Sequence, residues 1–558
     1  MYEKNLQFID NEALKTRLSK ISIDDSRMNM SYCMTPTNDY LLMKNDVPMD
    51  DINNPRGAIK EMLASTIKQQ MGTNDIIITF GIGLCYMLDE VFNTYPSKIF
   101  VYEPDIQLLH FVLNNVDISE HLSSGRVFIT DNLNELLAKL SATYITKDKV
   151  EVVYLKNYAV VKSQELLELT QKVYETCKSK TVDVNTITRY SKTWMFNSLK
   201  NIITINNGQA YMLSDLEGKF ESQTALILAA GPSFADNIEK IKANREKYVI
   251  FAVNKVAKLA IANGIIPDFI VGLDASYIED TISGFDDVLE RISYITDLRS
   301  DPRAYLKPFK KIFISFAEND ILAKKLKNYN SQIKMYECGG SSTTMAFVSA
   351  VKMGFSKIVF SGLDLAFKNS TIYSSGEQIE RISEDKIKIY GIEKNLSFVK
   401  SVTGEKVLTS DDYAAFIKHF ETLIKDMEYT EVYNTTSFGA AIEGMKNSPF
   451  ENIFFMHTAN TTAFILGEVK PFKLETSAWT QDELALVNEV IALLSKGAYS
   501  PALISAITKS PLLYQYMQAD ILKVIQSKMN PAFAEEFMNQ AKQGIKEIID
   551  VLQKNRLI

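Results

Sequence analysis

The sequence predicts an α/β protein with two Rossmann-like parallel-sheet domains followed by an all-helical C-terminal domain. Short apolar segments alternate with helical segments twice, first in residues 75–154 and again, more strongly, in residues 224–361. Such alternation is typical of parallel sheets whose strands are joined by helices. Residues 475–558 instead carry apolar residues at three- and four-residue spacing, which indicates helices. The 558 residues are too many for one compact core, and we place the domains at residues 1–205, 206–450 and 451–558.

The strands of both sheets are expected where β-branched and apolar residues cluster. In the N-terminal domain these segments are residues 75–80, 98–102, 126–130 and 150–154, whereas the opening 60 residues are polar and give no clear pattern. In the central domain they are residues 224–230, 248–253, 268–273, 311–316, 333–336 and 357–361. In the C-terminal domain we expect helices over residues 480–496 and 531–554, the first opened by a capping box of Thr480 and Glu483.

Composition and charge exclude several classes of protein. Hydrophobic residues make up 46% of the chain and the net charge is −7, which is ordinary for a globular protein and gives no general attraction to nucleic acid. No apolar run reaches the roughly 18 residues that a membrane helix needs, and no apolar segment follows the polar first residues. The four cysteines are far apart, without zinc-ligand spacing. We therefore expect a cytoplasmic protein without a membrane span.

A first candidate site lies where the strand segment 224–230 runs into Gly231-Pro232-Ser233. Glycine lets a ligand approach the backbone closely, and proline suits the first position of a helix, where its missing N–H is not needed. Ser233 could cap the helix and offer its hydroxyl outward, while free N–H groups at a helix start favour a phosphate. Ser233 and Asp236 also have capping-box spacing, so this segment could do no more than cap.

Two polar residues stand at the ends of the next two strand segments. Asn254 follows residues 248–253, and Asp274 follows residues 268–273. Ligands of open α/β sheets bind outside the carboxyl ends of the strands, so both residues belong to the same candidate site. Asn254 could read a base or a ribose by hydrogen bonds, and Asp274 could hold a ribose hydroxyl or a metal. Each could also be a turn residue.

A second glycine- and hydroxyl-rich segment precedes an apolar helix. Residues 339–344 read Gly-Gly-Ser-Ser-Thr-Thr, which suits a second polar group of a nucleotide or simple capping of the helix. The strand segment that comes next, residues 357–361, ends in Gly362-Leu363-Asp364. Asp364 could act at the site or cap a turn.

These pieces, in this order, resemble the motility-associated factor (Maf) family of flagellin glycosyltransferases. The matching pieces are Ala-Gly-Pro-Ser-Phe (230–234), Ala-Val-Asn (252–254), Ile-Ile-Pro-Asp-Phe-Ile-Val-Gly-Leu-Asp (265–274), Gly-Ser-Ser-Thr-Thr (340–344), Gly-Leu-Asp-Leu-Ala-Phe (362–367) and Asn-Thr-Thr-Ser-Phe-Gly-Ala-Ala-Ile-Glu-Gly (434–444). The core is also similar to bacterial CMP-dependent sialyltransferases. The resemblance implies transfer of a nonulosonic acid, pseudaminic or legionaminic, from a CMP donor to Ser or Thr of flagellin before export.

The resemblance also implies roles for individual residues. The residues expected to hold the donor are Gly231, Pro232, Ser233, Asn254, Asp274, Ser341, Ser342, Thr343, Gly362 and Phe367. Those expected to act in catalysis are Asp364, Tyr373 and Glu405. Tyr373 stands where the family often has histidine, and a phenol can stabilise charge on the departing phosphate. Glu405 is the candidate base, because none of the four histidines falls where sialyltransferases carry theirs. No metal site is assigned, and a divalent metal stays open.

Three alternatives remain at this point. Some archaeal pterin diphosphokinases share the Gly-Pro-Ser core, although they are single short domains. Gly81, Gly83 and Glu103 have the spacing of a dinucleotide or S-adenosylmethionine site, but Cys85 and Tyr86 stand where a third glycine belongs. The chain could also be a non-catalytic flagellin-binding protein whose helical C-terminal domain holds the partner.

Overall fold

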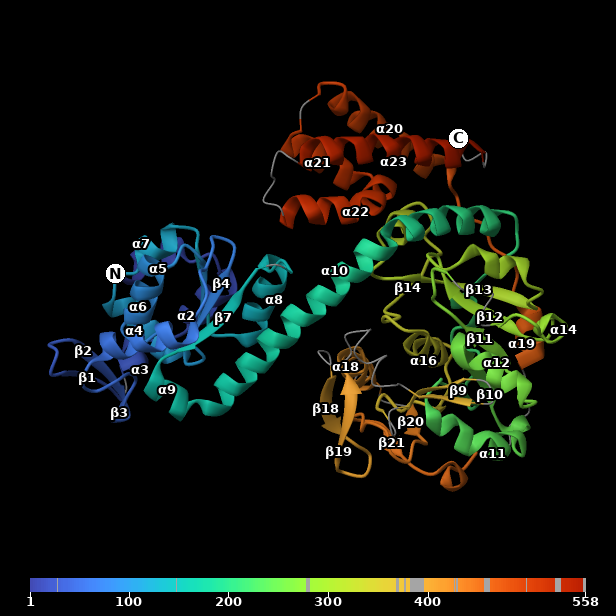
Figure 1. Ribbon diagram of the computed structural model, residues 1–558, viewed down its shortest axis with the longest axis horizontal. Helices are drawn as coiled ribbons and strands as arrows, with labels where there is room; N and C mark the ends of the chain where they lie inside the picture. The colour runs from blue at the N-terminus through green and yellow to red at the C-terminus, as the bar shows by residue number, and fades with distance from the viewer. Residues whose placement is uncertain are drawn as a thin grey trace. The chain divides into compact units, whose positions relative to one another are not determined.

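The computed structural model confirms the predicted fold class. It describes residues 1–27, 29–146, 148–276, 282–367, 371–375, 378–381, 396–425, 427, 430–455, 462–497, 499–526 and 533–554. The chain forms two compact units, Met1–Thr186 and Ile187–Ile558, and the 44-residue helix α10 (Ser163–Asn206) begins in the first and ends in the second (Figure 1). The three domain boundaries expected above stay a prediction. No helix in the described part of the chain is both long and apolar enough to cross a membrane.

The first unit is built on a parallel sheet of four strands in the order β6-β5-β4-β7. All four strands start at or within one residue of the predicted segments, and β5 and β7 match them fully; β4, β5 and β6 are largely buried, whereas β7 is half-buried. An antiparallel sheet β1-β2-β3 was not expected from the polar opening residues. The elements are α1 (Tyr2–Phe8), α2 (Glu12–Leu18), α3 (Ile23–Arg27), β1 (Met30–Met34), β2 (Tyr40–Lys44), β3 (Val47–Pro48), α4 (Pro55–Thr66), β4 (Ile76–Phe80), α5 (Tyr86–Thr94), β5 (Lys98–Tyr102), α6 (Ile106–Asn115), α7 (Ser119–Ser123), β6 (Val127–Thr130), α8 (Leu133–Thr143), β7 (Val150–Tyr154) and α9 (Lys156–Val161).

The glycine turn after β4 is filled by side chains of the same unit. A Cβ atom at Gly81 would lie 2.6 Å from the ring of Tyr158, and one at Gly83 would lie 2.9 Å from Leu155. Glu103 is fully buried, where it accepts hydrogen bonds from the backbone N–H of Ile82 (3.0 Å) and from the Tyr158 hydroxyl. These contacts account for the two glycines and the acidic residue through packing, without a bound cofactor.

Burial of Glu103 predicts a pH effect on stability. Burial raises the pKa of Glu103 from 4.5 to about 7, so the native state binds this proton more tightly than the unfolded chain. The protonated carboxyl group of Glu103 therefore stabilises the native state fully below pH 4.5. The free energy of unfolding then falls by about 3 kcal/mol as the pH rises through 7. We expect Glu103→Gln to gain about that much stability relative to wild type between pH 5 and pH 8. Urea unfolding of both proteins at the two pH values measures this difference; a difference that stays constant would contradict the prediction.

The second unit contains a larger parallel sheet in the order β14-β13-β12-β11-β10-β9-β15-β20-β21, with β8 beside β13. From β9 the chain adds strands outward to β14 and then returns to the other side of β9 with β15, so the strand order reverses between β9 and β15. Along β9, Leu226 and Leu228 pack into the core on one face, and Ala225 and Ile227 pack into the core on the other. Helices α12 and α15 cover the first face, and α16 and α18 cover the second.

The six predicted strand segments overlap β9, β10, β11, β13, β14 and β15, whereas β8, β12, β20 and β21 were not predicted. The strands and helices of this region lie between residues 211 and 452. They are β8 (Tyr211–Met212), η1 (Leu213–Leu216), β9 (Thr224–Leu228), η2 (Pro232–Asn237), α11 (Ile238–Lys242), η3 (Arg245–Lys247), β10 (Val249–Val253), α12 (Asn254–Ala262), β11 (Phe269–Val271), α14 (Asp286–Leu289), β12 (Ser293–Asp297), η4 (Pro302–Leu306), β13 (Lys311–Ala317), α15 (Ile321–Lys327), β14 (Met335–Tyr336), α16 (Ser342–Lys352), β15 (Lys357–Ser361), α18 (Asp411–Lys425), β20 (Glu431–Asn434), β21 (Lys446–Asn447) and η6 (Phe450–Asn452). Two antiparallel hairpins stand between β15 and α18, namely β16 (Thr371–Ser375) with β17 (Gln378–Arg381) and β18 (Leu396–Lys400) with β19 (Lys406–Ser410).

The C-terminal part is helical, as predicted, but the predicted capping box of Thr480 and Glu483 does not form. The helices are α19 (Thr462–Glu468), α20 (Ser477–Leu494), α21 (Pro501–Lys509), α22 (Pro511–Gln526) and α23 (Ala534–Lys554). Thr480 lies inside α20 and its hydroxyl donates to the carbonyl of Thr476, one turn back. Glu483 is buried and accepts hydrogen bonds from the Ser510 hydroxyl and the Leu512 N–H (3.1 Å). Thr480 is therefore bonded within the first turn of α20, whereas Glu483 joins α20 to the start of α22.

Candidate functional site

A cleft lies at the carboxyl ends of β9, β10, β11 and β15, where the strand order of the large sheet reverses. This is the place where open α/β sheets bind their ligands. The cleft has a volume of about 290 Å³. It is lined by Ala229, Ala230, Gly231, Val253, Asn254, Lys255, Leu273, Asp274, Gly340, Ser341, Ser342, Thr343, Gly362, Leu363, Asp364, Leu365, Ala366, Tyr413, Phe416 and Phe420. The structure thus brings together most of the residues that the sequence assigned to the donor.

The turn after β9 requires glycine because two backbone segments meet there. The N–H of Gly231 donates to the carbonyl of Gly362 at 2.9 Å, which ties the end of β9 to the end of β15. A Cβ atom at Gly231 would overlap that carbonyl oxygen and would lie 2.9 Å from Cγ of Asp364. Gly362 itself has a φ of +85°, in the region that favours glycine. Pro232 starts the 3₁₀ helix η2, as its fixed φ angle suits.

Ser233 is joined to Asp364 beneath this turn. The N–H of Ser233 donates to Oδ2 of Asp364 at 2.9 Å, and its hydroxyl donates to Oδ1. Ser233 and Asp364 are only 1% and 2% exposed. The expectation that Ser233 offers its hydroxyl outward is therefore wrong, and in the described structure the capping box with Asp236 does not form either. The contacts make Asp364 a positioning residue that holds the Gly-Pro-Ser turn in place.

Asn254 and Asp274 form a polar pair across the neighbouring strands. Asn254 is buried at the first position of α12, and its amide nitrogen donates to the carboxylate of Asp274. Asp274 is exposed to the cleft, and its main-chain carbonyl accepts from the N–H of Asp301 at 3.0 Å. The pair therefore presents a fixed carboxylate, which can accept hydrogen bonds from sugar hydroxyls.

The start of α16 forms the opposite wall. Ser341 caps this 11-residue helix, because its hydroxyl accepts from the N–H of Thr344 at 3.1 Å and the two side chains complete a capping box. The hydroxyl of Ser342 accepts from the N–H of Leu273 at 3.3 Å, so this wall is bonded to the end of β11. The capping interpretation is confirmed for Ser341, and both serines line the cleft together with Thr343, while binding of a nucleotide there stays a prediction. The helix start favours an anion.

Some predicted residues fall outside the described lining of the cleft. Phe367 packs against the ring of Tyr413, with 5.8 Å between the ring centroids, so it supports a residue that does line it. Glu405 is exposed in the turn between β18 and β19 and gives the cleft no described contact. The backbone of β16, which carries Tyr373, lies beside η2 and α12. The Tyr373 side chain lies outside the described residues.

The sequence analysis did not assign several residues that line the cleft, among them one cation and three aromatic rings. Lys255 carries positive charge beside Asn254, and Tyr413, Phe416 and Phe420 come from α18. Their three- and four-residue spacing was the available signal, since it places the three rings on one face of a helix. No group of three or more His, Cys, Asp or Glu residues suited to a metal occurs within the described ranges.

Comparisons with known proteins give one family match, one partial relative and one similar fold. Residues 196–370 match the family described as 6-hydroxymethylpterin diphosphokinase MptE-like. A protein of Treponema pallidum (strain Nichols), described as uncharacterized, is 31% identical over 124 residues, which span 22% of this chain and 55% of the length of that relative. The structure of a Maf glycosyltransferase from Magnetospirillum magneticum AMB-1 aligns with 100% of this chain and 96% of the glycosyltransferase chain. The TM-score is 0.66 and the sequence identity is 15%. The chain thus has the fold of a Maf glycosyltransferase along its whole length.

Proposed function

We propose that the chain is a glycosyltransferase that moves a nonulosonic acid, pseudaminic or legionaminic, from a CMP-activated donor to a Ser or Thr hydroxyl of flagellin. One observation carries the proposal: the cleft at the strand-order reversal collects the glycine turn, the Asn254–Asp274 pair and the hydroxyl-rich start of α16 in one place. The shared Maf fold supports the same conclusion. Transfer before export would take place in the cytoplasm.

The cleft offers complementary groups to each part of CMP. The carboxylate of Asp274, held by Asn254, suits the ribose hydroxyls. The N-terminus of α16 and the Lys255 ammonium group suit the phosphate, because both favour negative charge. The partly exposed ring of Phe416 gives an apolar surface on which the base can pack, with buried Phe420 behind the lining.

The reaction would be a single displacement at the anomeric carbon. The bond from that carbon to the phosphate oxygen breaks as the bond to the acceptor oxygen forms, and CMP leaves with the electron pair. Positive charge near the phosphate stabilises this developing charge, which is the task we assign to Lys255 and the start of α16. Tyr373 is proposed as a hydrogen-bond donor to the same phosphate. The hydroxyl of Ser or Thr must lose a proton, and Glu405 stays a prediction for that base.

Calorimetric titration with nucleotides tests the proposal. We expect CMP to bind and ATP, UDP and S-adenosylmethionine to bind weakly or not at all, with and without magnesium. Asn254→Leu should weaken CMP binding about tenfold, because it removes the amide that orients Asp274. Asn263→Leu at the C-terminal end of the same helix is the matched control and should bind CMP like wild type. Equal CMP affinity in both variants would argue against this cleft as the donor site.

A pterin diphosphokinase is the second candidate, since the matching family carries that description over residues 196–370. Such an enzyme transfers a diphosphate from ATP, so preferential and magnesium-dependent binding of ATP would favour it. A non-catalytic flagellin-binding protein would bind flagellin without consuming a CMP-sugar. Release of CMP from the donor in the presence of flagellin separates that possibility from the proposed transferase.

A further inference from the structure

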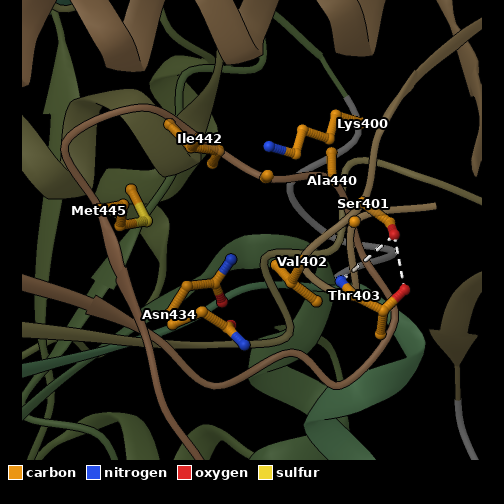
Figure 2. Close-up of a pocket in the computed structure, with 11 residues that line it drawn as sticks. Lys400, Ser401, Val402, Thr403, Asn434, Ala440, Ile442 and Met445 are labelled. Atoms are coloured by element: carbon orange, nitrogen blue, oxygen red, sulfur yellow. Dashed lines mark hydrogen bonds between the residues drawn. The ribbon is translucent and has the colours of Figure 1, made fainter. Parts of the chain in front are cut away.

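A second pocket lies at the same edge of the large sheet, beside the donor cleft. It has a volume of about 350 Å³ and shares no lining residue with the cleft among those the structure describes. Its floor comes from the ends of β20 and β21, through Asn434 and Asn447, and from residues 440–445 between them. The turn of the β18–β19 hairpin, residues 400–404, forms the other wall (Figure 2). We call it the Lys400 pocket.

Lys400 is the one charged residue in the described lining of this pocket. Its side chain reaches across the pocket, with the ammonium group pointing toward Ile442 (Figure 2). Within the described ranges no carboxylate forms an ion pair with Lys400, whereas nearby Lys446 pairs with Glu431 at 2.7 Å. Among the described residues, the exposed ammonium group of Lys400 therefore has no carboxylate partner, and the pocket favours an anionic ligand.

The hairpin turn adds two hydroxyl groups to the pocket lining. Ser401 is buried, and its hydroxyl lies 2.8 Å from the hydroxyl of Thr403 and accepts from the Thr403 N–H at 3.3 Å (Figure 2). Only one of the two hydroxyl protons can serve the bond between them, so the other can be donated to a ligand. Val402, Ile442 and Met445 add an apolar surface. A carboxylate, hydroxyl groups and a small apolar substituent on one molecule would match this lining.

The pocket is bonded to the loop that lines the donor cleft. The amide of Asn434 donates to the carbonyl of Leu363 at 2.8 Å, and the N–H of Ala440 donates to the carbonyl of Asp364 at 2.8 Å. Gly439 lies so close to Asp364 that a Cβ atom there would be 2.8 Å from its Cα. These residues belong to the segment 434–444, which resembled the Maf family but has no place in the donor cleft.

We propose that the Lys400 pocket binds a carboxylated, hydroxylated sugar of the sialic-acid class. The ammonium group of Lys400 receives the carboxylate, the Ser401–Thr403 pair bonds a sugar hydroxyl, and the apolar wall packs against an N-acyl methyl group. The choice of sugar class rests on the proposed function, whereas the need for a carboxylate rests on the pocket alone. Binding here fixes the loop of residues 362–366 through Asn434 and Ala440.

Lys400→Met tests the pocket, with Lys406→Met as its matched control. Lys406 is exposed, stands directly opposite Lys400 on the neighbouring strand and is not part of the described lining. The probes are free N-acetylneuraminic acid and its methyl ester, with binding followed by saturation-transfer NMR. We expect the acid to bind wild type and Lys406→Met equally, and to bind Lys400→Met at least about tenfold more weakly. The ester, which lacks the charge, should bind wild type as weakly as the acid binds Lys400→Met.

Three results would overturn the inference: equal binding of acid and ester, equal binding by the two lysine variants, or Lys400-dependent binding of an acidic peptide but not of the sugar. CMP titration of the same proteins keeps this test separate from the proposed function. CMP carries no sugar acid, so Lys400→Met should bind it like wild type. Failure of the wild-type protein to bind CMP would contradict the proposed function. The comparison of acid with ester would still show whether the Lys400 pocket binds a carboxylated sugar.

Discussion

Asp364→Asn is expected to weaken CMP binding by about a hundredfold and to lower the free energy of unfolding by about 2–3 kcal/mol. The carboxylate accepts from both the N–H and the hydroxyl of Ser233, and both residues are buried. An amide in its place removes the negative charge that strengthens both bonds, and its NH2 group can stay bonded to the Ser233 hydroxyl only if that hydroxyl turns round to accept. The Gly-Pro-Ser turn then loses the group that holds it at the cleft. Calorimetry with CMP and urea unfolding measure the two effects.

Asp236→Asn provides the matched control for this experiment. Asp236 is exposed on the same short helix, η2, so the substitution makes the same chemical change without touching the buried pair. We expect wild-type CMP affinity and stability within about 0.5 kcal/mol. Full CMP affinity in Asp364→Asn would show that the turn does not depend on this carboxylate, and the positioning role would have to be abandoned.

Gly231→Ala is expected to abolish measurable CMP binding. The added methyl group would overlap the carbonyl oxygen of Gly362 and press on the carboxylate of Asp364, which are both fixed by hydrogen bonds. Relief requires β9 and β15 to separate at their carboxyl ends, where the cleft is lined. Overpacking of this kind costs about 1–3 kcal/mol, so the variant should fold with reduced stability. Circular dichroism establishes that it is folded before the CMP titration.

Gly467→Ala controls for the loss of a glycine as such. Gly467 is exposed in helix α19 with open space around its Cα, so alanine fits and favours the helix. This variant should be as stable as wild type or slightly more stable and should bind CMP normally. CMP binding by Gly231→Ala at wild-type strength would mean that the turn can relax without disturbing the cleft.

The sequence predicted the sheets where burial and β-branched residues coincide. Strands β5 and β7 begin and end where expected because apolar runs such as Lys98–Tyr102 have few other stable arrangements. Strand β12 was missed, although it is fully buried, because its Ser293-Tyr-Ile-Thr-Asp297 sequence looks polar. The hydroxyl of Thr296 donates to the carbonyl of Gly272, directly after the neighbouring strand β11. A partner in another strand cannot be seen from a local pattern.

The candidate site shows the same limit. Strand ends were sufficient to place Gly231, Asn254 and Asp274 at one edge of the sheet, and the structure brings them together. The direction of the Ser233 side chain was not predictable, since its partner lies 131 residues further along the chain. Local spacing suggested capping boxes that begin at Ser233 and at Thr480. The Ser233 hydroxyl instead bonds to Asp364, and the Thr480 hydroxyl bonds to the carbonyl of Thr476.

The order of strands also bears on how the protein is made. Strand β9 is synthesised long before β15, yet β9 lies between β10 and β15 in the sheet, and the Ser233–Asp364 contact needs both. A nascent chain that ends before residue 364 therefore contains the Asn254–Asp274 pair but no closed cleft. If the cleft is the donor site, as proposed, no N-terminal fragment ending before β15 should bind CMP, and CMP binding would report completion of the sheet.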